Sequence, residues 1–310
     1  MQRRNIGSLS VSVVGVGCNN FGARLDARHS AEVVHAALDA GVNFFDTADV
    51  YGATQSEVYL GLALASRRDE AVIATKFGMP IDDAHYGASP AYVREACAAS
   101  LRRLGTDYID LYQLHYPDET VPIEETLGAL HELVEAGHVR EIGCSNLTAD
   151  QLRAARAAAG DRPGFASIQN QYSLLAREVE RDGVLDACDE LGVALLPYYP
   201  LANGLLTGKV RPGEPLPEGT RLSLMSAERS VHWLSDSFQA KVAALLEYAN
   251  SIDVAILTLA FSWLLDHERV ASVIAGASNA DQVRANAAAV TTLGADVLAR
   301  LNELTGFDAP

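Results

Sequence analysis

Short apolar runs rich in β-branched residues alternate with longer amphipathic stretches along this chain, and the alternation recurs about every 30 residues. One strand-plus-helix unit has this length. Runs such as IDLYQL and GVALLPYY are apolar almost throughout, which is typical of strands buried on both faces of a parallel sheet. The expected strands are Val13–Val16, Asn43–Asp46, Val72–Lys76, Ile109–His115, Val139–Ser145, Ser167–Gln171, Val193–Tyr198 and Ala271–Ala275.

The stretches between these runs have the end signals of helices. Ser89 and Pro90 supply an N-cap and a first-position proline for a helix that runs to Leu104, and Gly105 follows it. Pro122 opens another helix with acidic residues in its first turn. Eight strand–helix units of this kind favour a closed (β/α)8 TIM barrel over an open doubly wound sheet.

We expect residues 1–310 to form one such barrel domain of the α/β class, with three additions. Residues Arg4–Val11 resemble a short N-terminal hairpin that closes the barrel floor. A stretch rich in Gly and Pro, from Leu201 to about Ser237, follows the seventh strand and is long enough to be a lid or binding loop. Asp296–Leu304 is expected to form one extra C-terminal helix.

The net charge of −16 and the pI near 4.8 disfavour a nucleic-acid groove or an anionic membrane surface as the partner, because both require a basic face. One phosphorylated small molecule is still compatible with this charge.

The N-terminus has no apolar signal-peptide core, and the most apolar stretch, Val254–Leu265, is too short to cross a bilayer. Four cysteines without a CxxC pair fit reduced thiols, so a cytoplasmic protein is expected. No metal-ligand spacing occurs, so no metal site is predicted.

Three neighbouring predicted strands each end in an ionisable residue. Asp46 ends one strand and Tyr51 lies in the loop after it, while Lys76 and His115 end the next two. In a barrel the carboxyl ends of the strands share one face, where active sites are built. Each residue alone has an ordinary structural explanation, but together the four types make one working unit.

That unit suits the reduction of a carbonyl group. A tyrosine hydroxyl has an unperturbed pKa of about 10, and a nearby ammonium should lower the pKa of Tyr51 and ease proton release. Asp46 would keep a buried Lys76 protonated, and His115 would donate a hydrogen bond to the substrate oxygen. None of the four supplies a hydride, so a nicotinamide cofactor is required.

With these residues in place, the chain resembles the aldo-keto reductase family almost end to end. The segments GVNFFDTADVYG, VIATKFG, IDLYQLHYPD, GHVREIGCSN, IQNQYS, PYYPLANGLLTGK and IAGASNADQV match family blocks in family order. The resemblance implies that Asp46, Tyr51, Lys76 and His115 are the catalytic tetrad, with Tyr51 as the general acid. Some relatives are regulatory subunits of potassium channels, and these tend to carry another residue in place of His115.

The resemblance also implies a set of cofactor contacts. Ser145, Asn146 and Gln169 match residues that bind the nicotinamide carboxamide, and Tyr198 matches the residue that stacks on its ring. The pyrophosphate and adenosine ends match the segments around residues 200 and 280. The full set of expected cofactor residues is Cys18, Asn19, Asp46, Ser145, Asn146, Gln169, Tyr198, Tyr199, Pro200, Leu201, Ala202, Asn203, Lys209, Arg221, Gly276, Ser278, Gln282 and Asn286.

Two positions depart from the family pattern. Tyr199 stands where the family usually has a small Ser or Gly, and Ala285 replaces an acidic residue that often contacts adenine. A 2′-phosphate would depend on Ser278 with Arg221 or another nearby cation, so we expect NADP(H) to be preferred and keep NAD(H) as the alternative. The glycines between Gly15 and Gly22 resemble a dinucleotide fingerprint, but their spacing is wrong and no helix is expected to start there.

The expected function is therefore the reduction of a small-molecule aldehyde or ketone, or the reverse oxidation of a sugar or secondary alcohol. Two alternatives stay open: a non-catalytic cofactor-sensing regulatory subunit, and a lyase in which Lys76 forms a Schiff base. Phe21, Tyr116, His232 and Trp233 are candidates for the substrate pocket, with ordinary loop packing as the other explanation. The sequence determines neither the substrate nor the oligomeric state.

Overall fold

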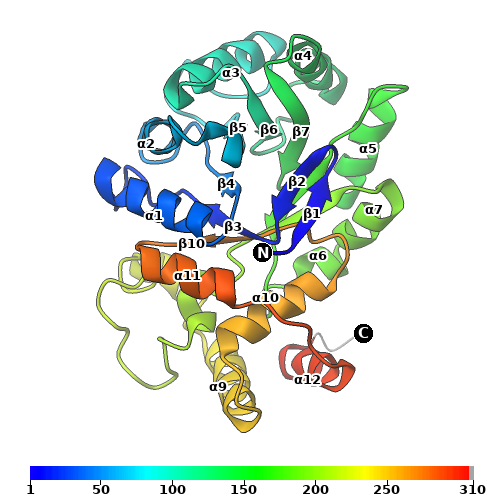
Figure 1. Ribbon diagram of the computed structural model, residues 1–310. Coiled ribbons are helices and arrows are strands. Elements are labelled where there is room, and N and C mark those ends of the chain that lie inside the picture. Colours follow the sequence, from blue (N-terminus) through cyan, green and yellow to red (C-terminus); the bar gives the residue numbers. More distant parts are fainter. Residues whose placement is uncertain (307–310) are drawn as a thin grey trace.

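Eight parallel strands form the central barrel of the computed structural model, which describes residues 1–306 (Figure 1). The strands, in their order around the barrel, are β3 (Val14–Gly17), β4 (Phe44–Asp46), β5 (Val72–Phe77), β6 (Ile109–Leu114), β7 (Val139–Ser145), β8 (Ser167–Gln171), β9 (Ala194–Tyr198) and β10 (Val273–Gly276). The backbone N–H of Ala271 donates to the Leu195 carbonyl at 3.0 Å, which joins the last strand segment to β9 and closes the ring. The expected (β/α)8 barrel is confirmed, and each predicted strand lies within two residues of an observed one.

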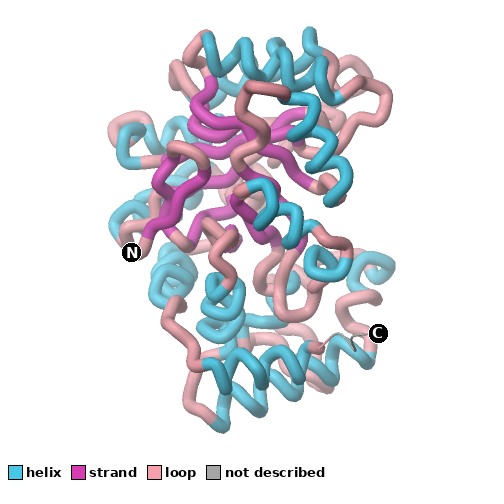
Figure 2. Tube along the Cα trace, turned by 90° about the vertical axis from the view of Figure 1, so that its right-hand side faces the viewer, coloured by secondary structure: helices cyan, strands magenta, loops and turns pink. Residues whose placement is uncertain are grey.

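Helices surround the strands, as the tube view shows (Figure 2). They are α1 (Ala27–Asp39), α2 (Gln55–Leu64), α3 (Pro90–Leu104), α4 (Ile123–Glu135), α5 (Ala149–Ala159), α6 (Glu178–Arg181), α7 (Val184–Leu191), α8 (Ala227–Ser230), α9 (Asp236–Ser251), α10 (Ile256–Asp266), α11 (Ala280–Ala288) and α12 (Ala295–Thr305), with 3-10 turns η1 (Arg68–Glu70) and η2 (Ala202–Thr207). Within the described residues no single helix is long and apolar enough to span a bilayer, although α9 and α10, bent by 99°, reach that length and composition as a pair.

The end signals of α3 act as the sequence predicts. The Ser89 side chain accepts from the backbone N–H of Tyr92 and Pro90 occupies the first turn, so two of the helix's unpaired N–H groups are accounted for. Gly105 closes the helix in the left-handed conformation with φ of 62°, which a glycine adopts without a side-chain clash.

A hairpin closes the floor of the barrel. It consists of β1 (Arg3–Ile6) and β2 (Leu9–Ser12), and it lies across the amino ends of the strands (Figure 1). Ile6, Leu9 and Val11 are buried against barrel-interior side chains such as Phe44 and Leu111. The hairpin therefore keeps water from the bottom of the barrel and leaves the opposite rim as the open end.

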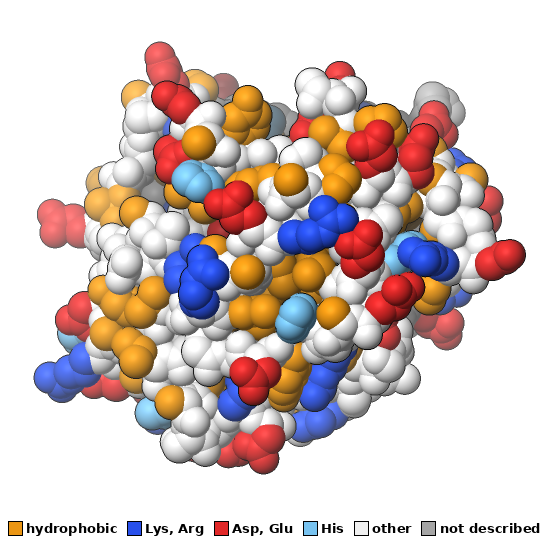
Figure 3. All heavy atoms as spheres, turned by 90° about the horizontal axis from the view of Figure 1, so that it is seen from above, with side chains coloured by type: hydrophobic (Ala, Val, Ile, Leu, Met, Phe, Trp, Pro, Cys, Tyr) orange, Lys and Arg blue, Asp and Glu red, His pale blue; other side chains and the backbone are white. Residues whose placement is uncertain are grey.

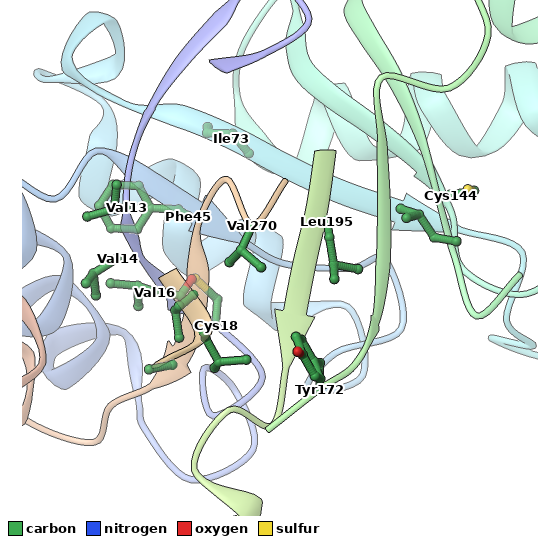
Figure 4. Close-up of a cluster of buried hydrophobic side chains, with 14 of the residues drawn as sticks. Val13, Val14, Val16, Cys18, Phe45, Ile73, Cys144, Tyr172, Leu195 and Val270 are labelled. Atoms are coloured by element: carbon green, nitrogen blue, oxygen red, sulfur yellow. The ribbon is translucent and has the colours of Figure 1, made fainter. Parts of the chain in front are cut away.

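The main core lies between the outer faces of the strands and the helices. Val14, Phe45, Ile73 and Leu195 are all at most 2% exposed in this layer, and Figure 4 shows them distributed over different strands. Burying an aliphatic or aromatic side chain of this kind contributes about 1.5–3 kcal/mol. This layer fixes the strand ends and so the positions of the side chains that they carry to the rim.

The long segment after the seventh barrel strand is irregular, as expected. It extends from Leu201 to Ser235 and contains only the short turns η2 and α8 before α9 begins. The extra C-terminal helix is also present, as α12.

Candidate active site

The barrel register brings Asp46, Tyr51, Lys76 and His115 together at the carboxyl ends of β4, β5 and β6. Asp46 is the last residue of β4, Lys76 is the penultimate residue of β5, and His115 directly follows β6. Lys76 Nζ lies 2.7 Å from Asp46 Oδ2 and 5.1 Å from the ring centroid of Tyr51. The rings of Tyr51 and His115 lie edge to face with centroids 5.8 Å apart. Four residues spread over 70 positions thus form one cluster.

Lys76 is a fully buried cation held by two oxygen acceptors. Its side chain is 0% exposed, and Nζ donates to Asp46 Oδ2 at 2.7 Å and to the Thr47 carbonyl at 2.9 Å. Burial by itself would lower the pKa of Lys76, but Asp46 and Tyr51 outweigh it, and the pKa is raised above its ordinary value. The ammonium form is therefore the one that faces Tyr51.

The pKa of Tyr51 shifts in the direction opposite to the one expected from the sequence. Burial raises the pKa of Tyr51, and the lowering by the Lys76 charge does not compensate for it. The reason is that the phenolate would have to form away from water, where the cost of a charge is high. Tyr51 is thus held as a neutral phenol, which is the form that can donate a proton.

His115 is neutral across the physiological range. Burial, together with the charge of Lys76, lowers the pKa of His115 to about 3. Its Nδ1 has no hydrogen-bond partner among the described residues, an arrangement that fits a proton on Nε2. Its ring stacks on Tyr116, with centroids 5.6 Å apart. A neutral imidazole can donate one hydrogen bond without adding a second positive charge beside Lys76.

Gln113 belongs to the same network, although it was not among the site residues expected from the sequence. Asp46 Oδ1 accepts from Gln113 Nε2 at 3.3 Å and from Gln169 Nε2 at 2.8 Å, while its Oδ2 accepts from Lys76. Three donors on one carboxylate fix the position of the Asp46 side chain. The alternation of side chains along a strand could have identified Gln113, because it lies two residues before His115 and so on the same barrel-interior face.

A cavity of about 1390 Å³ opens above this cluster at the barrel rim. Tyr51 and His115 line it, and Lys76 lies beneath the lining. Of the residues expected to hold the cofactor, those on the lining are Asn19, Asp46, Ser145, Asn146, Gln169, Tyr198, Tyr199, Pro200, Leu201, Asn203, Lys209, Arg221, Gly276, Ser278, Gln282 and Asn286. The structure therefore gathers the loops after β3, β4, β6, β7, β9 and β10 around one space.

Two of the expected cofactor residues lie behind the lining. Cys18 is 0% exposed, and its backbone N–H donates to the Asp46 carbonyl at 2.8 Å, so it is not free for a ligand. Ala202 is also 0% exposed, and its N–H donates to the Tyr199 carbonyl at 2.9 Å. Both residues shape the backbone behind the cavity wall.

The residues expected at the nicotinamide end are joined by hydrogen bonds. Tyr198 Oη donates to Asn146 Oδ1 at 2.9 Å, and Asn146 Nδ2 donates to Ser145 Oγ and to the His115 carbonyl, both at 3.0 Å. Ser145 Oγ donates to the Gln169 carbonyl at 2.7 Å. This network fixes the Tyr198 ring and couples its position to the catalytic cluster.

The polar groups around the cavity fit a phosphorylated dinucleotide. Asn19 Oδ1 and Asn203 Oδ1 are buried and have no hydrogen-bond partner among the described residues, so both can accept from a ligand. Helix α11 begins beside Ser278 and Gln282, where the positive end of a nine-residue helix favours an anion. Lys209 and Arg221 add positive charge to the same cavity.

Strained backbone is concentrated at this rim. Six of the seven non-glycine residues with positive φ lie in its loops, namely Ala53, Thr54, Asn146, Tyr199, Ala202 and Asn203. Such conformations cost about 1–3 kcal/mol each and persist where the surrounding structure imposes them, most often at functional sites. The rim is therefore shaped for a purpose other than stability.

Of the four candidates for the substrate pocket, one lines the cavity and three do not. Tyr116 lines the cavity and is 49% exposed. Phe21 is 0% exposed, and His232 and Trp233 pack against Phe238, so these three lie outside the lining. Residues 1–306 also contain no group of three or more His, Cys, Asp or Glu side chains that could hold a metal ion.

The chain is similar to known proteins in sequence and in structure. The Aldo/keto reductase family model matches residues 13–305. A probable aldo-keto reductase 1 from Glycine max is 41% identical over 207 residues, which are 64% of this chain and 58% of that relative's length. A probable voltage-gated potassium channel subunit beta from Arabidopsis thaliana is 34% identical over 94% of this chain and 92% of its own.

A solved structure shows the same barrel. The holo form of an aldo-keto reductase from Bacillus halodurans superposes with a TM-score of 0.80 and 32% sequence identity, over 100% of this chain and 99% of that one. The family model spans the barrel and all the segments that form the rim cavity. This chain therefore belongs to the aldo/keto reductase family, a family of NAD(P)H-dependent oxidoreductases with a (β/α)8 fold.

Proposed function

We propose that this protein reduces a small-molecule aldehyde or ketone in the cytoplasm, or oxidises a sugar or secondary alcohol in reverse, with Tyr51 as the general acid. The observation that supports this most directly is the fully buried ion pair of Lys76 with Asp46, which lies against the Tyr51 ring. A buried cation that faces a phenol serves to stabilise the phenolate that remains after the proton has left.

Each member of the cluster has one task in this reaction. A bound nicotinamide cofactor would supply the hydride. Tyr51 gives its phenolic proton to the carbonyl oxygen, and the Lys76 ammonium stabilises the resulting phenolate. Asp46 keeps Lys76 charged, and Gln113 and Gln169 hold Asp46 in place. Neutral His115 donates a hydrogen bond to the same carbonyl oxygen and orients it.

The cofactor assignment follows the cavity lining. Ser145, Asn146 and Gln169 would hold the carboxamide and Tyr198 the nicotinamide ring, whereas Ser278 and Gln282 would hold the adenosine end. Lys209 provides positive charge for the pyrophosphate, and Ser278 with Arg221 or another nearby cation would bind a 2′-phosphate. We therefore propose NADP(H) as the preferred cofactor over NAD(H).

The test measures the loss of NADPH or NADH absorbance at 340 nm, for the wild type and for Tyr51→Phe. The substrates are a panel of aldehydes, ketones, quinones and aldoses. The wild type should consume NADPH. Tyr51→Phe should lose turnover by about 10²–10⁴-fold, the size of a general-acid contribution, and still bind NADPH. A Tyr51→Phe variant with the wild-type rate on a good aldehyde would show that the acid is another residue.

A second candidate function is a non-catalytic, cofactor-sensing regulatory subunit. It is supported by the relative named as a channel beta subunit, which aligns with 94% of this chain. His115 favours catalysis, because the channel-associated relatives tend to carry another residue there. Tight NADPH binding with no consumption over the whole panel would favour the regulatory role.

A Schiff-base lyase requires Lys76 to act as a neutral, accessible nucleophile. The side chain is 0% exposed, and its pKa is raised, so the amine is held charged and out of reach. Treatment with borohydride and a carbonyl compound should therefore leave Lys76 unmodified.

A further inference from the structure

The cationic side chains of the rim cavity have no acidic partners. Four of them line it, and none forms an ion pair within residues 1–306: Arg24, Lys209, Arg221 and Arg229. Most arginines elsewhere contact a carboxylate, such as Arg68 with Asp110 at 2.7 Å. The carboxylates on the lining do not compensate, because Asp46 is paired with Lys76 and Glu218 forms no ion pair in the described part of the chain. In a chain of net charge −16, this local excess favours an anionic ligand.

The charges on the wider surface are arranged differently. The face in Figure 3 shows acidic and basic side chains interspersed, without a single-sign patch. The unpaired cations of the cavity thus differ from the mixed charges on this face.

Arg24 comes from the loop between β3 and α1, which packs directly on the catalytic loop. Gly52 follows Tyr51, and a Cβ atom on Gly52 would lie 2.3 Å from the Phe21 carbonyl oxygen. Gly22 is packed equally closely against Gln55. This contact leaves no room for a ligand between the two loops, so Arg24, two residues further on, belongs to the wall of the cavity that Tyr51 also forms.

Arg221 comes from the long loop and lines the same cavity as Arg24. Its guanidinium lies 4.6 Å from the centroid of the Tyr199 ring and donates to Tyr199 Oη at 2.8 Å. Tyr199 in turn is close enough to Tyr51 to contribute to the raised pKa of that phenol. Burial and the positive charge of Arg221 lower the pKa of Arg24, so the two cations affect each other. An anion between them would relieve this repulsion and could receive hydrogen bonds from both.

The cofactor's own phosphates have other partners available. Ser278 and Gln282, at the start of α11, are assigned to the adenosine end, and Lys209 lies on the segment expected at the pyrophosphate. Arg24 has no place in that assignment. Arg24 lines the same cavity as Tyr51, the residue that the carbonyl must reach to receive a proton.

We infer that Arg24 binds an anionic group of the carbonyl substrate, a carboxylate or a phosphate, and so makes the enzyme prefer negatively charged aldehydes or ketones. This inference rests on the proposed reductase function.

The experiment compares an anionic aldehyde with a neutral one of similar shape, 4-carboxybenzaldehyde and its methyl ester, with NADPH at saturation. The ratio of kcat/KM for the acid to that for the ester is measured in the wild type, in Arg24→Gln, and in Arg28→Gln. Arg28 is a matched control, because it lies four residues away, pairs with Glu32 on the surface and does not line the cavity. We expect Arg24→Gln to lower the ratio about tenfold, the size of one charge-assisted hydrogen bond, and Arg28→Gln to leave it unchanged.

A binding measurement accompanies the kinetics, so that the result does not depend on turnover. Terephthalate is titrated into the NADP⁺-saturated wild type and Arg24→Gln, and the Kd of NADPH is measured for both proteins. Weaker terephthalate binding with an unchanged Kd for NADPH supports the inference. An unchanged acid-to-ester ratio, no terephthalate binding to the wild type, or a loss confined to NADPH affinity would each overturn it. The last result would assign Arg24 to a cofactor phosphate. Turnover of neither aldehyde, with terephthalate binding that depends on Arg24, would refute the reductase function alone.

Discussion

The Lys76–Asp46 pair makes a prediction in which stability and pH are linked. Replacing Asp46 by Asn keeps the size of the side chain but removes its charge, and it leaves Lys76 buried without a counter-ion. Lys76, Gln113 and Gln169 all donate hydrogen bonds to the residue at position 46. The asparagine must turn one polar atom toward Lys76 and the other toward the two glutamines. Its Nδ2 would then face a donor whichever way the amide is turned.

The magnitude follows from the burial of the pair. Removing one partner of a buried ion pair costs about 3–5 kcal/mol. A loss of about 3 kcal/mol in the stability of the Lys76 ammonium corresponds to a fall of roughly two units in the pKa of Lys76. In the wild type the folded pKa of Lys76 is raised above 10.5, so the stabilisation is present below pH 10.5 and is lost only above it. In Asp46→Asn the folded pKa lies below the unfolded one. The variant is then destabilised at neutral pH and regains stability as the pH rises to about 10.

The assay is the midpoint of thermal unfolding, Tm, of the wild type and of Asp46→Asn between pH 7 and pH 10. At pH 7 the variant should unfold roughly 6–12 °C lower, and the gap should narrow toward pH 10. Asp39→Asn is the control, because Asp39 is 69% exposed where it pairs with Arg67, and surface pairs contribute at most about 1 kcal/mol. A gap for Asp46→Asn that stays constant across this range, or that is no larger than the control's, would refute the argument that Lys76 is charged and depends on Asp46.

Three further predictions concern other buried groups. Burial and Lys76 lower the pKa of His115 to about 3. The pH profile of kcat/KM between pH 5 and 8 should therefore contain no ionisation from His115. The variant His115→Asn should reduce the rate without changing the shape of that profile. Asp49 is 0% exposed, its carboxylate oxygens have no hydrogen-bond partner among the described residues, and burial and the nearby Glu57 raise its pKa to about 7. The raised pKa of Asp49 therefore destabilises the fold progressively as the pH rises from about 4, and fully above pH 7. Asp49→Asn should raise the stability by about 2–4 kcal/mol at pH 8, with the gain lost as the pH falls toward 4. Denaturant unfolding at both pH values checks this. Arg103 Nε donates to Glu57 Oε2 at 2.6 Å, and Glu57 is 0% exposed. The variant Arg103→Leu should therefore lose about 3–5 kcal/mol of unfolding free energy in the same denaturant assay. A loss below 1 kcal/mol would contradict the buried pairing.

The sequence alone predicted the barrel and the place of the catalytic cluster. Alternating strands and helices can bury their apolar faces in few ways, and in a closed barrel every strand must end at the same rim. Asp46, Lys76 and His115 follow apolar runs directly, so their common location was predictable without coordinates. The resemblance to a known family, which the comparisons confirm, then supplied their expected roles.

Only the tertiary structure decided the electrostatics of the site. The direction of the Tyr51 pKa depends on how completely the phenol is removed from water, and the sequence does not encode that quantity locally. Gln113 became visible as a partner of Asp46 only through the strand register, although the two are 67 residues apart. Arg24 and Arg221 are almost 200 positions apart in the sequence, and only the fold brings their unpaired charges into one cavity. Charge–charge interactions and desolvation depend on distance in space and on burial, so they are fixed only once the loops have packed.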